Sequence, residues 1–340
     1  MLRLWLKSTG AKEHRMLIDE KSIAEPADSP GVSDHHLRSA ESVTLMLSYQ
    51  PPFAWSTILK FLGDRAIPGV EYVESSRYHR TVVIPHKGVI CQGWISLANC
   101  PELNLVAVTI SSSLFPVINQ VPARVRFLLD LDCMPEEIEE KLGTMQIEGE
   151  RVFQPGLRMP GCFDSFEMAV RAILGQQITV RGARTLAMRI ATRLGEPLST
   201  PFRELIVTFP TAERICSLEQ PVEDHLGPLG VTGARARAIR ALAEALQLGE
   251  IRLEPEADLE REMANLADLR GFGPWTVQYL AMRALGWQDA FLHTDYGVKK
   301  ALGNIPPKDM LALAQEWAPW RSYATLSLWN HLVEQSRTME

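Results

Sequence analysis

Residues 268–300 read D-L-R-G-F-G-P-W-T-V-Q-Y-L-A-M-R-A-L-G-W-Q-D-A-F-L-H-T-D-Y-G-V-K-K, and this segment carries the most specific pattern in the chain. It opens with a tight turn, Gly271-Phe272-Gly273, followed by Pro274, a residue favoured in the first turn of a helix. Apolar residues then recur at helical spacing. The glycines let a partner approach the backbone closely, and N–H groups at a helix N-terminus suit a phosphate oxygen. The segment therefore predicts a turn before a helix that can bind an anion.

One aspartate, Asp295, follows that turn in the sequence. Asp295 follows Trp275 by twenty residues and comes after the apolar run Ala290-Phe291-Leu292. A glycine helix cap and a solvated aspartate would give the same pattern without any site. The segment as a whole resembles the helix-hairpin-helix plus Gly/Pro...Asp signature of the DNA glycosylase superfamily. The resemblance implies that the hairpin binds the DNA backbone and that Asp295 lies at the mouth of a base pocket.

Four further stretches resemble one branch of that superfamily, the AlkA-type DNA glycosylases (DNA-3-methyladenine glycosylase II). They read Y-Q-P-P-F-A-W at 49–55, P-G-L-R-M-P-G-C at 155–162, A-I-L-G-Q-Q at 172–177 and E-W-A-P-W-R-S-Y-A-T-L-S-L-W at 316–329. With the hairpin, the resemblance covers roughly residues 44–335. It implies an enzyme that flips alkylated, cationic purines such as 3-methyladenine out of double-stranded DNA and excises them. The product would be an abasic site in base excision repair.

The same resemblance implies an α+β fold, in which a small N-terminal antiparallel-sheet domain precedes a mostly helical helix-hairpin-helix core. Residues 1–42 are polar and are expected to be a flexible extension. Residues 43–133 are expected to form the α+β domain. Residues 134–340 are expected to be an all-helical glycosylase region of two lobes, with a boundary that crosses near residues 165 and 288. Composition and apolar spacing predict strands at Thr81–Ile84, Val89–Leu97 and Leu103–Ile110, and helices at 55–62 and Val121–Leu129.

Three aromatic residues are candidates for the base pocket. Trp275 and Tyr279 lie four residues apart and hence on one helix face, and Trp329 follows Asp295 by 34 residues. Aromatic residues at such spacing also occur in ordinary cores. The resemblance implies that all three line the pocket, where an indole stacked on a cationic purine gains roughly 1–2 kcal/mol.

Contacts with DNA are also implied by the resemblance. It assigns them to the hairpin residues Gly271, Phe272, Gly273 and Thr276. Gln177 matches the side chain that relatives push into the duplex, although a polar turn between two helices explains it equally well. Arg235 and Arg237 open a helix after a degenerate second hairpin, and they are either phosphate contacts or a solvated basic face.

Asp295 is the candidate catalytic group. Alkylation at a ring nitrogen makes the base a good leaving group, so the enzyme chiefly needs a carboxylate that stabilises positive charge on the sugar and orients water. Relatives that also cut the strand carry a lysine directly after the hairpin turn, where it forms a Schiff base. Trp275 occupies that place, so the enzyme is expected to be monofunctional. No cofactor is expected; the resemblance implies at most a monovalent cation at the carbonyls of Ala267, Leu269 and Phe272.

Composition sets weaker limits. The 340 residues are 46% hydrophobic and 22% charged, as is usual for globular proteins, and the net charge of -6 is not typical of a nucleic-acid binder. The five cysteines show no C-x-x-C or metal-ligand spacing, and no 18-residue apolar stretch occurs. We expect a cytoplasmic monomer without membrane contact. Two alternatives stay open: a glycosylase for other lesions, and a non-catalytic helix-hairpin-helix DNA-binding protein.

Overall fold

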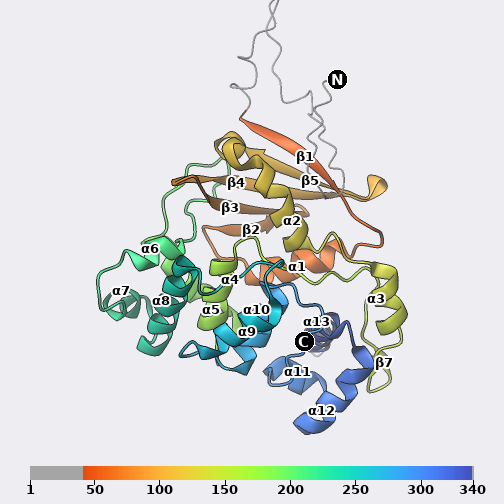
Figure 1. Ribbon diagram of the computed structural model, residues 1–340. Helices are drawn as coiled ribbons and strands as arrows, with labels where there is room; N and C mark the ends of the chain where they lie inside the picture. Colours follow the sequence, from red (N-terminus) through yellow and green to blue (C-terminus); the bar gives the residue numbers. More distant parts are fainter. Residues whose placement is uncertain (1–40, 339–340) are drawn as a thin grey trace, which may run out of the picture.

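The computed structural model describes residues 41–338, so the prediction of a flexible extension falls almost wholly outside the described residues. A five-stranded antiparallel sheet belongs to the N-terminal part of the described chain, and most of the helices follow it (Figure 1). Its spatial order is β1-β5-β4-β3-β2. The strands are β1 Ser42–Ser48, β2 Glu71–Glu74, β3 Arg77–His86, β4 Val89–Cys100 and β5 Leu105–Ser111.

All three predicted strands are present, with different ends, and β1 and β2 were not predicted. The strand predicted from Leu103 begins at Leu105, because Pro101–Leu103 forms a 3-10 turn that ends on Asn104 in the left-handed conformation. Register places Val108 between Leu45 and Leu97, and all three side chains are buried. Alternate residues of these central strands therefore face one core.

The helices follow the apolar spacing of the sequence. Both predicted helices are present: α1 extends past the predicted residues 55–62 to Arg65, and α2 has the predicted bounds. These two belong to the sheet domain, and the others follow it. Their bounds are α1 Trp55–Arg65, α2 Val121–Leu129, α3 Pro135–Leu142, α4 Ser165–Gly175, α5 Val180–Leu194, α6 Ala212–Cys216, α7 Glu223–Leu226, α8 Gly233–Leu248, α9 Leu259–Asp268, α10 Pro274–Arg283, α11 Tyr296–Ala301, α12 Pro307–Ala314 and α13 Arg321–Thr338.

Residues 134–340 are not all helical, which corrects one prediction. A two-stranded ladder pairs β6 (Gln146–Ile147) with β7 (Glu150–Arg151). Glu148 and Gly149 between them have φ values of 53° and 85°. Two consecutive left-handed residues give the turn that suits a short antiparallel hairpin.

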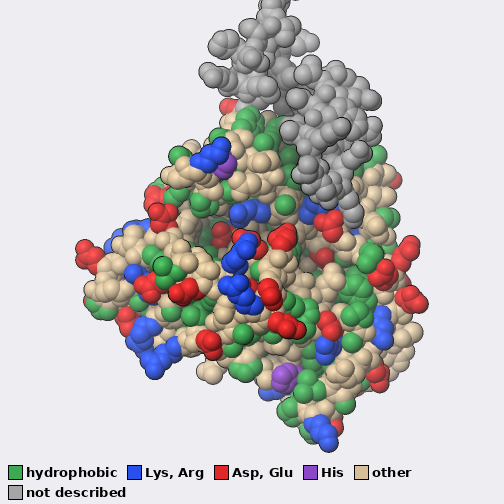
Figure 2. Space-filling view, in the orientation of Figure 1, with side chains coloured by type: hydrophobic (Ala, Val, Ile, Leu, Met, Phe, Trp, Pro, Cys, Tyr) green, Lys and Arg blue, Asp and Glu red, His purple; other side chains and the backbone are tan. Residues whose placement is uncertain are grey.

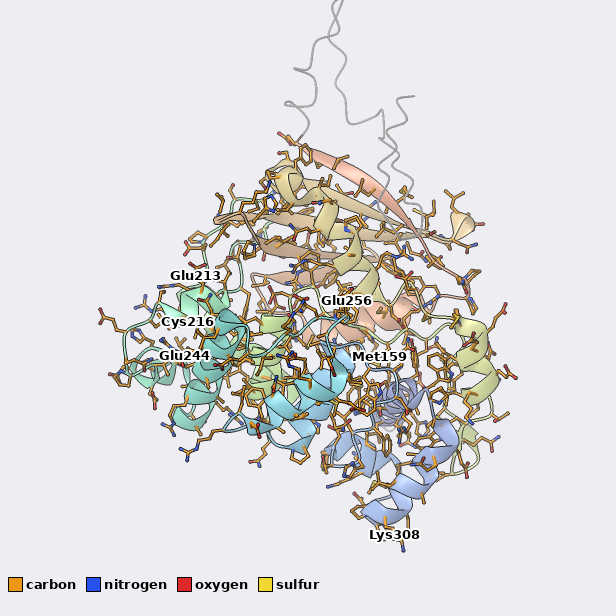
Figure 3. All side chains as sticks on the ribbon, viewed as in Figure 1. Met159, Glu213, Cys216, Glu244, Glu256 and Lys308 are labelled. Atoms are coloured by element: carbon orange, nitrogen blue, oxygen red, sulfur yellow. The ribbon has the colours of Figure 1, made fainter. Side chains whose placement is uncertain are left out.

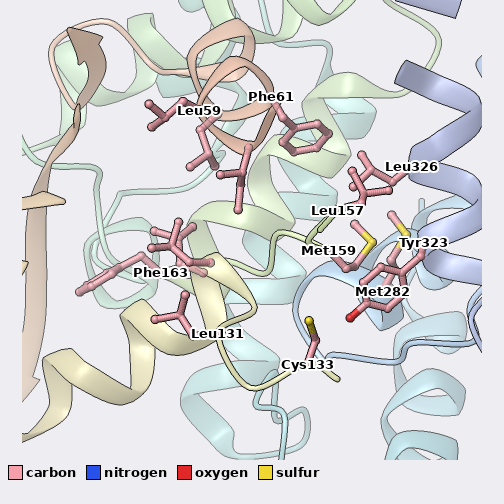
Figure 4. Close-up of a cluster of buried hydrophobic side chains, with 14 of the residues drawn as sticks. Leu59, Phe61, Leu131, Cys133, Leu157, Met159, Phe163, Met282, Tyr323 and Leu326 are labelled. Carbon is pink, nitrogen blue, oxygen red and sulfur yellow. The ribbon is translucent and has the colours of Figure 1, made fainter. Parts of the chain in front are cut away.

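Two hydrophobic clusters form the interior. One joins the sheet domain to the C-terminal helices; in Figure 4, Phe61 of α1, Met282 of α10 and Leu326 of α13 lie around the same space. The other cluster contains α4, α5, α8 and most of α10. The predicted lobe boundary near residues 165 and 288 stays a prediction.

A buried ionic cluster connects the sheet to α4. Arg80 Nη2 lies 2.7 Å from Glu167 Oε2, and Arg171 Nη1 lies 2.9 Å from Glu71 Oε2. Removing one member would leave a buried charge unpaired, which typically costs about 3–5 kcal/mol. The cluster therefore fixes α4 against the sheet domain.

Candidate active site

The turn between α9 and α10 has the geometry of a hairpin open to a partner. Gly271 has a φ of 97°, and a Cβ there would lie 3.1 Å from the Cβ of Ala238 on α8. Gly273 precedes the first turn of α10, has no side-chain cap, and has no neighbour within 4 Å of an added Cβ. Gly271 therefore permits packing against α8, and Gly273 leaves the start of α10 accessible.

Two of the residues predicted to contact DNA, Phe272 and Thr276, make contacts within the protein that stabilise the turn. Phe272 is buried, and its backbone N–H donates to Leu269 O over 3.1 Å. Thr276 is 2% exposed, and its Oγ1 accepts a hydrogen bond from Gln176. The side chains of Phe272 and Thr276 therefore lie inside the protein, and contact of these two residues with DNA stays a prediction. The cation site at the carbonyls of Ala267, Leu269 and Phe272 stays a prediction.

Asp295 is the N-cap of α11 and is held by three donors. Its Oδ1 accepts from Val298 N over 3.0 Å and from Trp329 Nε1 over 2.9 Å. Its Oδ2 accepts from Trp275 Nε1 over 2.9 Å. Residues from α10 and α13 thus fix the half-buried carboxylate.

The three predicted aromatic residues lie together around this carboxylate. The rings of Trp275 and Tyr279 are stacked, with centroids 5.0 Å apart and an interplanar angle of 16°. Tyr279 and Trp329 are tilted, with centroids 6.4 Å apart. A 5.0 Å separation leaves no room for a third ring, so a planar ligand cannot enter between Trp275 and Tyr279.

A cavity of about 400 Å³ opens beside Asp295 and these rings. Segments from α1, α4, α5, α10, α11 and α13 form its lining. This volume falls within the range usual for small-molecule sites, roughly 300–1,000 Å³. The cavity is large enough for a purine base.

Arginines also line the cavity, and no pattern in the sequence predicted them there. They are Arg65, Arg171, Arg184 and Arg283. Burial lowers the pKa of Arg65 to about 10, and its guanidinium lies 3.7 Å from the ring centroid of Phe61. Arg171 is paired with glutamates, and Arg283 Nη1 donates to Tyr279 Oη over 3.0 Å. Arg65 belongs to α1 of the sheet domain, so this domain contributes to the lining of the cavity.

Tyr296 is a further lining residue that was not predicted. It follows Asp295 directly, lies in the first turn of α11, and is 78% exposed. Its position directly after the candidate catalytic residue Asp295 could have identified it from the sequence.

The other predicted contacts lie outside the cavity lining. Gln177 is exposed, whereas the following residues Ile178 and Val180 line the cavity. Arg235 donates to the backbone oxygen of Gln176, and Arg237 forms an ion pair of 2.5 Å with Glu223. Both arginines therefore have partners within the protein.

A larger cavity, of about 790 Å³, lies apart from these residues. Met159 and Glu256 line it, and both are labelled in Figure 3. The face seen in Figure 2 has Lys and Arg interspersed with Asp and Glu and shows no continuous basic patch. Within residues 41–338, no group of three or more His, Cys, Asp or Glu could hold a metal ion. No helix in the described part of the chain is long and apolar enough to cross a membrane.

Comparisons with known proteins concern the family and the fold of this chain. The family model of the AlkA N-terminal domain matches residues 44–164. DNA-3-methyladenine glycosylase 2 of Escherichia coli is 36% identical over 288 residues, which are 83% of this chain and 95% of that protein. The chain belongs to the DNA-3-methyladenine glycosylase 2 family. The resemblance inferred from the sequence is thereby confirmed.

A Mycobacterium tuberculosis protein named probable bifunctional transcriptional activator/DNA repair enzyme AlkA is also 36% identical, over 86% of this chain. The chain spans 58% of that relative's length. Among solved structures, a 3-methyladenine DNA glycosylase from Archaeoglobus fulgidus superposes with a TM-score of 0.67 at 21% identity, covering 84% of this chain and 96% of that one. An 8-oxoguanine glycosylase/lyase from Clostridium acetobutylicum reaches 0.61 at 15% identity, over 86% and 96% of the two chains. These structures confirm the predicted α+β helix-hairpin-helix fold.

Proposed function

We propose that this protein is a monofunctional DNA glycosylase that excises alkylated purines from double-stranded DNA. The observation that carries the proposal is the hydrogen bonding of Asp295, whose two carboxylate oxygens accept from Trp275 and Trp329 beside a cavity of about 400 Å³. A base inside a duplex is out of reach of such a carboxylate, so the damaged nucleotide has to be flipped into the cavity. The names of the relatives support this substrate class.

In the proposed reaction Asp295 acts on the sugar. A purine alkylated at a ring nitrogen carries a positive charge and leaves as a neutral base. The negative charge of Asp295 stabilises the positive charge that builds on the sugar, and one of its oxygens orients the attacking water. The indole N–H groups and Val298 N hold the carboxylate in place, so it need not reorganise during the reaction.

The aromatic rings would bind the flipped base from the side. Because Trp275 and Tyr279 are stacked on each other, the base has to stack on an outer face of that pair or against Trp329. A cationic base gains more from an indole face than a neutral one. Arg65 stays protonated at neutral pH and opposes this preference, so the rings and Asp295 must outweigh it.

Strand cleavage is not part of the proposal. No lysine is among the residues that line the cavity, and Trp275 stands directly after the hairpin turn. Lys299 and Lys300 lie on α11, beyond Asp295. The hairpin, through Gly273 and the first N–H groups of α10, would hold the DNA backbone of a single protein–DNA complex, with the protein as a monomer.

The test is to identify the bases that the purified protein releases from methylated duplex DNA. Release of 3-methyladenine or 7-methylguanine without strand cleavage, and without a borohydride-trapped adduct, is expected. Asp295→Asn should bind abasic-site DNA but lose excision. Activity of the folded variant within about tenfold of wild type, roughly 1.4 kcal/mol of barrier, would rule out Asp295 as the catalytic group. Release of other bases alone, or binding without release, would favour the two alternative functions.

A further inference from the structure

Gln176 joins three elements next to the cavity. Its side-chain Nε2 donates to Gly271 O in the hairpin turn over 2.9 Å and to Thr276 Oγ1 on α10 over 2.9 Å. Its backbone oxygen accepts from Arg235 in the first turns of α8. Since Gly271 O can only accept, the amide nitrogen must face the hairpin. One residue thus links the α4–α5 connection to the hairpin and to α8.

The connection that Gln176 holds is strained. Gln176 has φ -57° and ψ 122°, and Gln177 has a φ of 57°. Ile178 N donates to Gly175 O over 3.4 Å, so residues 175–178 form a type II turn. The third position of such a turn favours glycine, and a left-handed glutamine there is disfavoured. Contacts outside the turn have to keep it in this conformation.

The same turn carries the apolar rim of the cavity. Ile178 and Val180 are 38% and 47% exposed, and both line the cavity on the side where α5 begins. Gln177 is exposed at the tip of the turn. Under the proposed function, an exposed side chain of this turn fills the space left by the flipped nucleotide, so the turn has to hold its position while the base leaves the stack.

We infer that Gln176 is a positioning residue, which holds the strained turn of residues 175–178 against the hairpin so that the turn can support base extrusion. The inference rests on the proposed function. The same hairpin that would bind the backbone thereby fixes the turn that would enter the duplex. Arg235, predicted to be either a phosphate contact or part of a solvated basic face, donates here to the backbone oxygen of Gln176.

The experiment compares Gln176→Ala with wild type on two substrates. One is a duplex with a paired 7-methylguanine, and the other carries the same lesion in single-stranded DNA, where no extrusion is needed. Two hydrogen bonds are lost, so single-turnover excision from the duplex should fall about 10- to 100-fold, and excision from the single strand less than about threefold. Gln315→Ala, at an exposed glutamine remote from the cavity, is the matched control and should change neither rate.

A second variant keeps the test valid if Gln176→Ala fails to fold. Thr276→Val removes one acceptor of the same amide with little change of shape, and it should give a smaller duplex-specific loss. A fall of equal size on both substrates, or no fall, would overturn the positioning role. The proposed function fails separately: it does so if wild type releases no base from either substrate.

Discussion

Trp329→Phe separates two contributions of one indole to the candidate active site. The Nε1 of Trp329 donates to Asp295 Oδ1 over 2.9 Å, and its ring lies 6.4 Å, centroid to centroid, from that of Tyr279. Phenylalanine keeps an aromatic face in the cavity and removes the donor. Alanine removes both. The pair of variants therefore distinguishes placement of the carboxylate from stacking on the base.

The expected decreases in excision rate follow from the two interactions of Trp329, the hydrogen bond to Asp295 and the stacking on the base. A hydrogen bond to a charged group contributes about 1.5–3 kcal/mol, so Trp329→Phe should lower single-turnover excision by about 10- to 100-fold for every lesion. Stacking adds about 1–3 kcal/mol per base, which Trp329→Ala also loses. The cation–π part of that loss applies only to a charged base. The additional fall in Trp329→Ala should therefore be larger for 7-methylguanine than for neutral hypoxanthine.

The assay is single-turnover excision of both lesions from otherwise identical duplexes. Trp94→Phe is the control, because Trp94 lies on β4 and packs against Phe202, with ring centroids 4.9 Å apart, away from the cavity. Full activity of Trp329→Phe on both lesions would refute the idea that the indole N–H positions Asp295. An equal additional fall for both lesions in Trp329→Ala would mean that the ring selects by shape, and lesion choice would then depend on the leaving group.

Three further outcomes are expected. The Gly273→Val variant should fold and should bind all duplexes more weakly, to the same extent for each sequence. Gly271→Val should instead destabilise the protein, because Gly271 has a φ of 97° and packs against Ala238. A loss of affinity for only some DNA sequences in Gly273→Val would contradict backbone binding by the hairpin. Burial, partly offset by the hydrogen bond from Tyr323 Oη, raises the pKa of Asp130 to about 6. The stability from this group is complete below about pH 4 and is lost as the pH rises through 6, so Asp130→Asn should raise the free energy of unfolding in urea at pH 8 by up to about 3 kcal/mol and change it little at pH 4. The logarithm of DNA affinity should fall with the logarithm of salt concentration with a slope of only about -2 to -4, and a slope near -8 would show many more phosphate contacts.

Local patterns in the sequence were sufficient for the centre of the site. The Gly-x-Gly turn before Pro274 predicted the hairpin, and the four-residue spacing of Trp275 and Tyr279 placed both rings on one side of α10. Trp329 needed the family resemblance, because nothing local indicates that a residue of α13 meets Asp295. Its position depends on the packing of α11 against α13, which is a long-range contact.

Other parts of the site depend on packing that spacing does not encode. Arg65 reaches the cavity because the ionic cluster fixes α4 to the sheet domain, and Arg171 donates from α4 to the backbone oxygen of Arg65 over 2.6 Å. Gln177 has a left-handed φ of 57°, which local preference disfavours, and the adjacent Gln176 is hydrogen-bonded to Gly271 and Thr276, about 100 residues away in the sequence. The edge strand β2 has only four residues and acquires its register from β3. In each case a non-local contact overrides the local signal.

The net charge of -6 becomes understandable once the partners of the basic side chains are known. Arg235 and Arg237, the two arginines predicted to contact phosphate or to form a solvated basic face, donate to a backbone oxygen and to a glutamate. Their charges help to hold the protein together. In the proposed complex, the N–H groups at the start of α10 bind the DNA phosphates. These groups carry no net charge and act only at short range. Such a protein would leave undamaged DNA easily, and it would discriminate at the cavity, where Asp295 and the rings act on a base that has already been extruded.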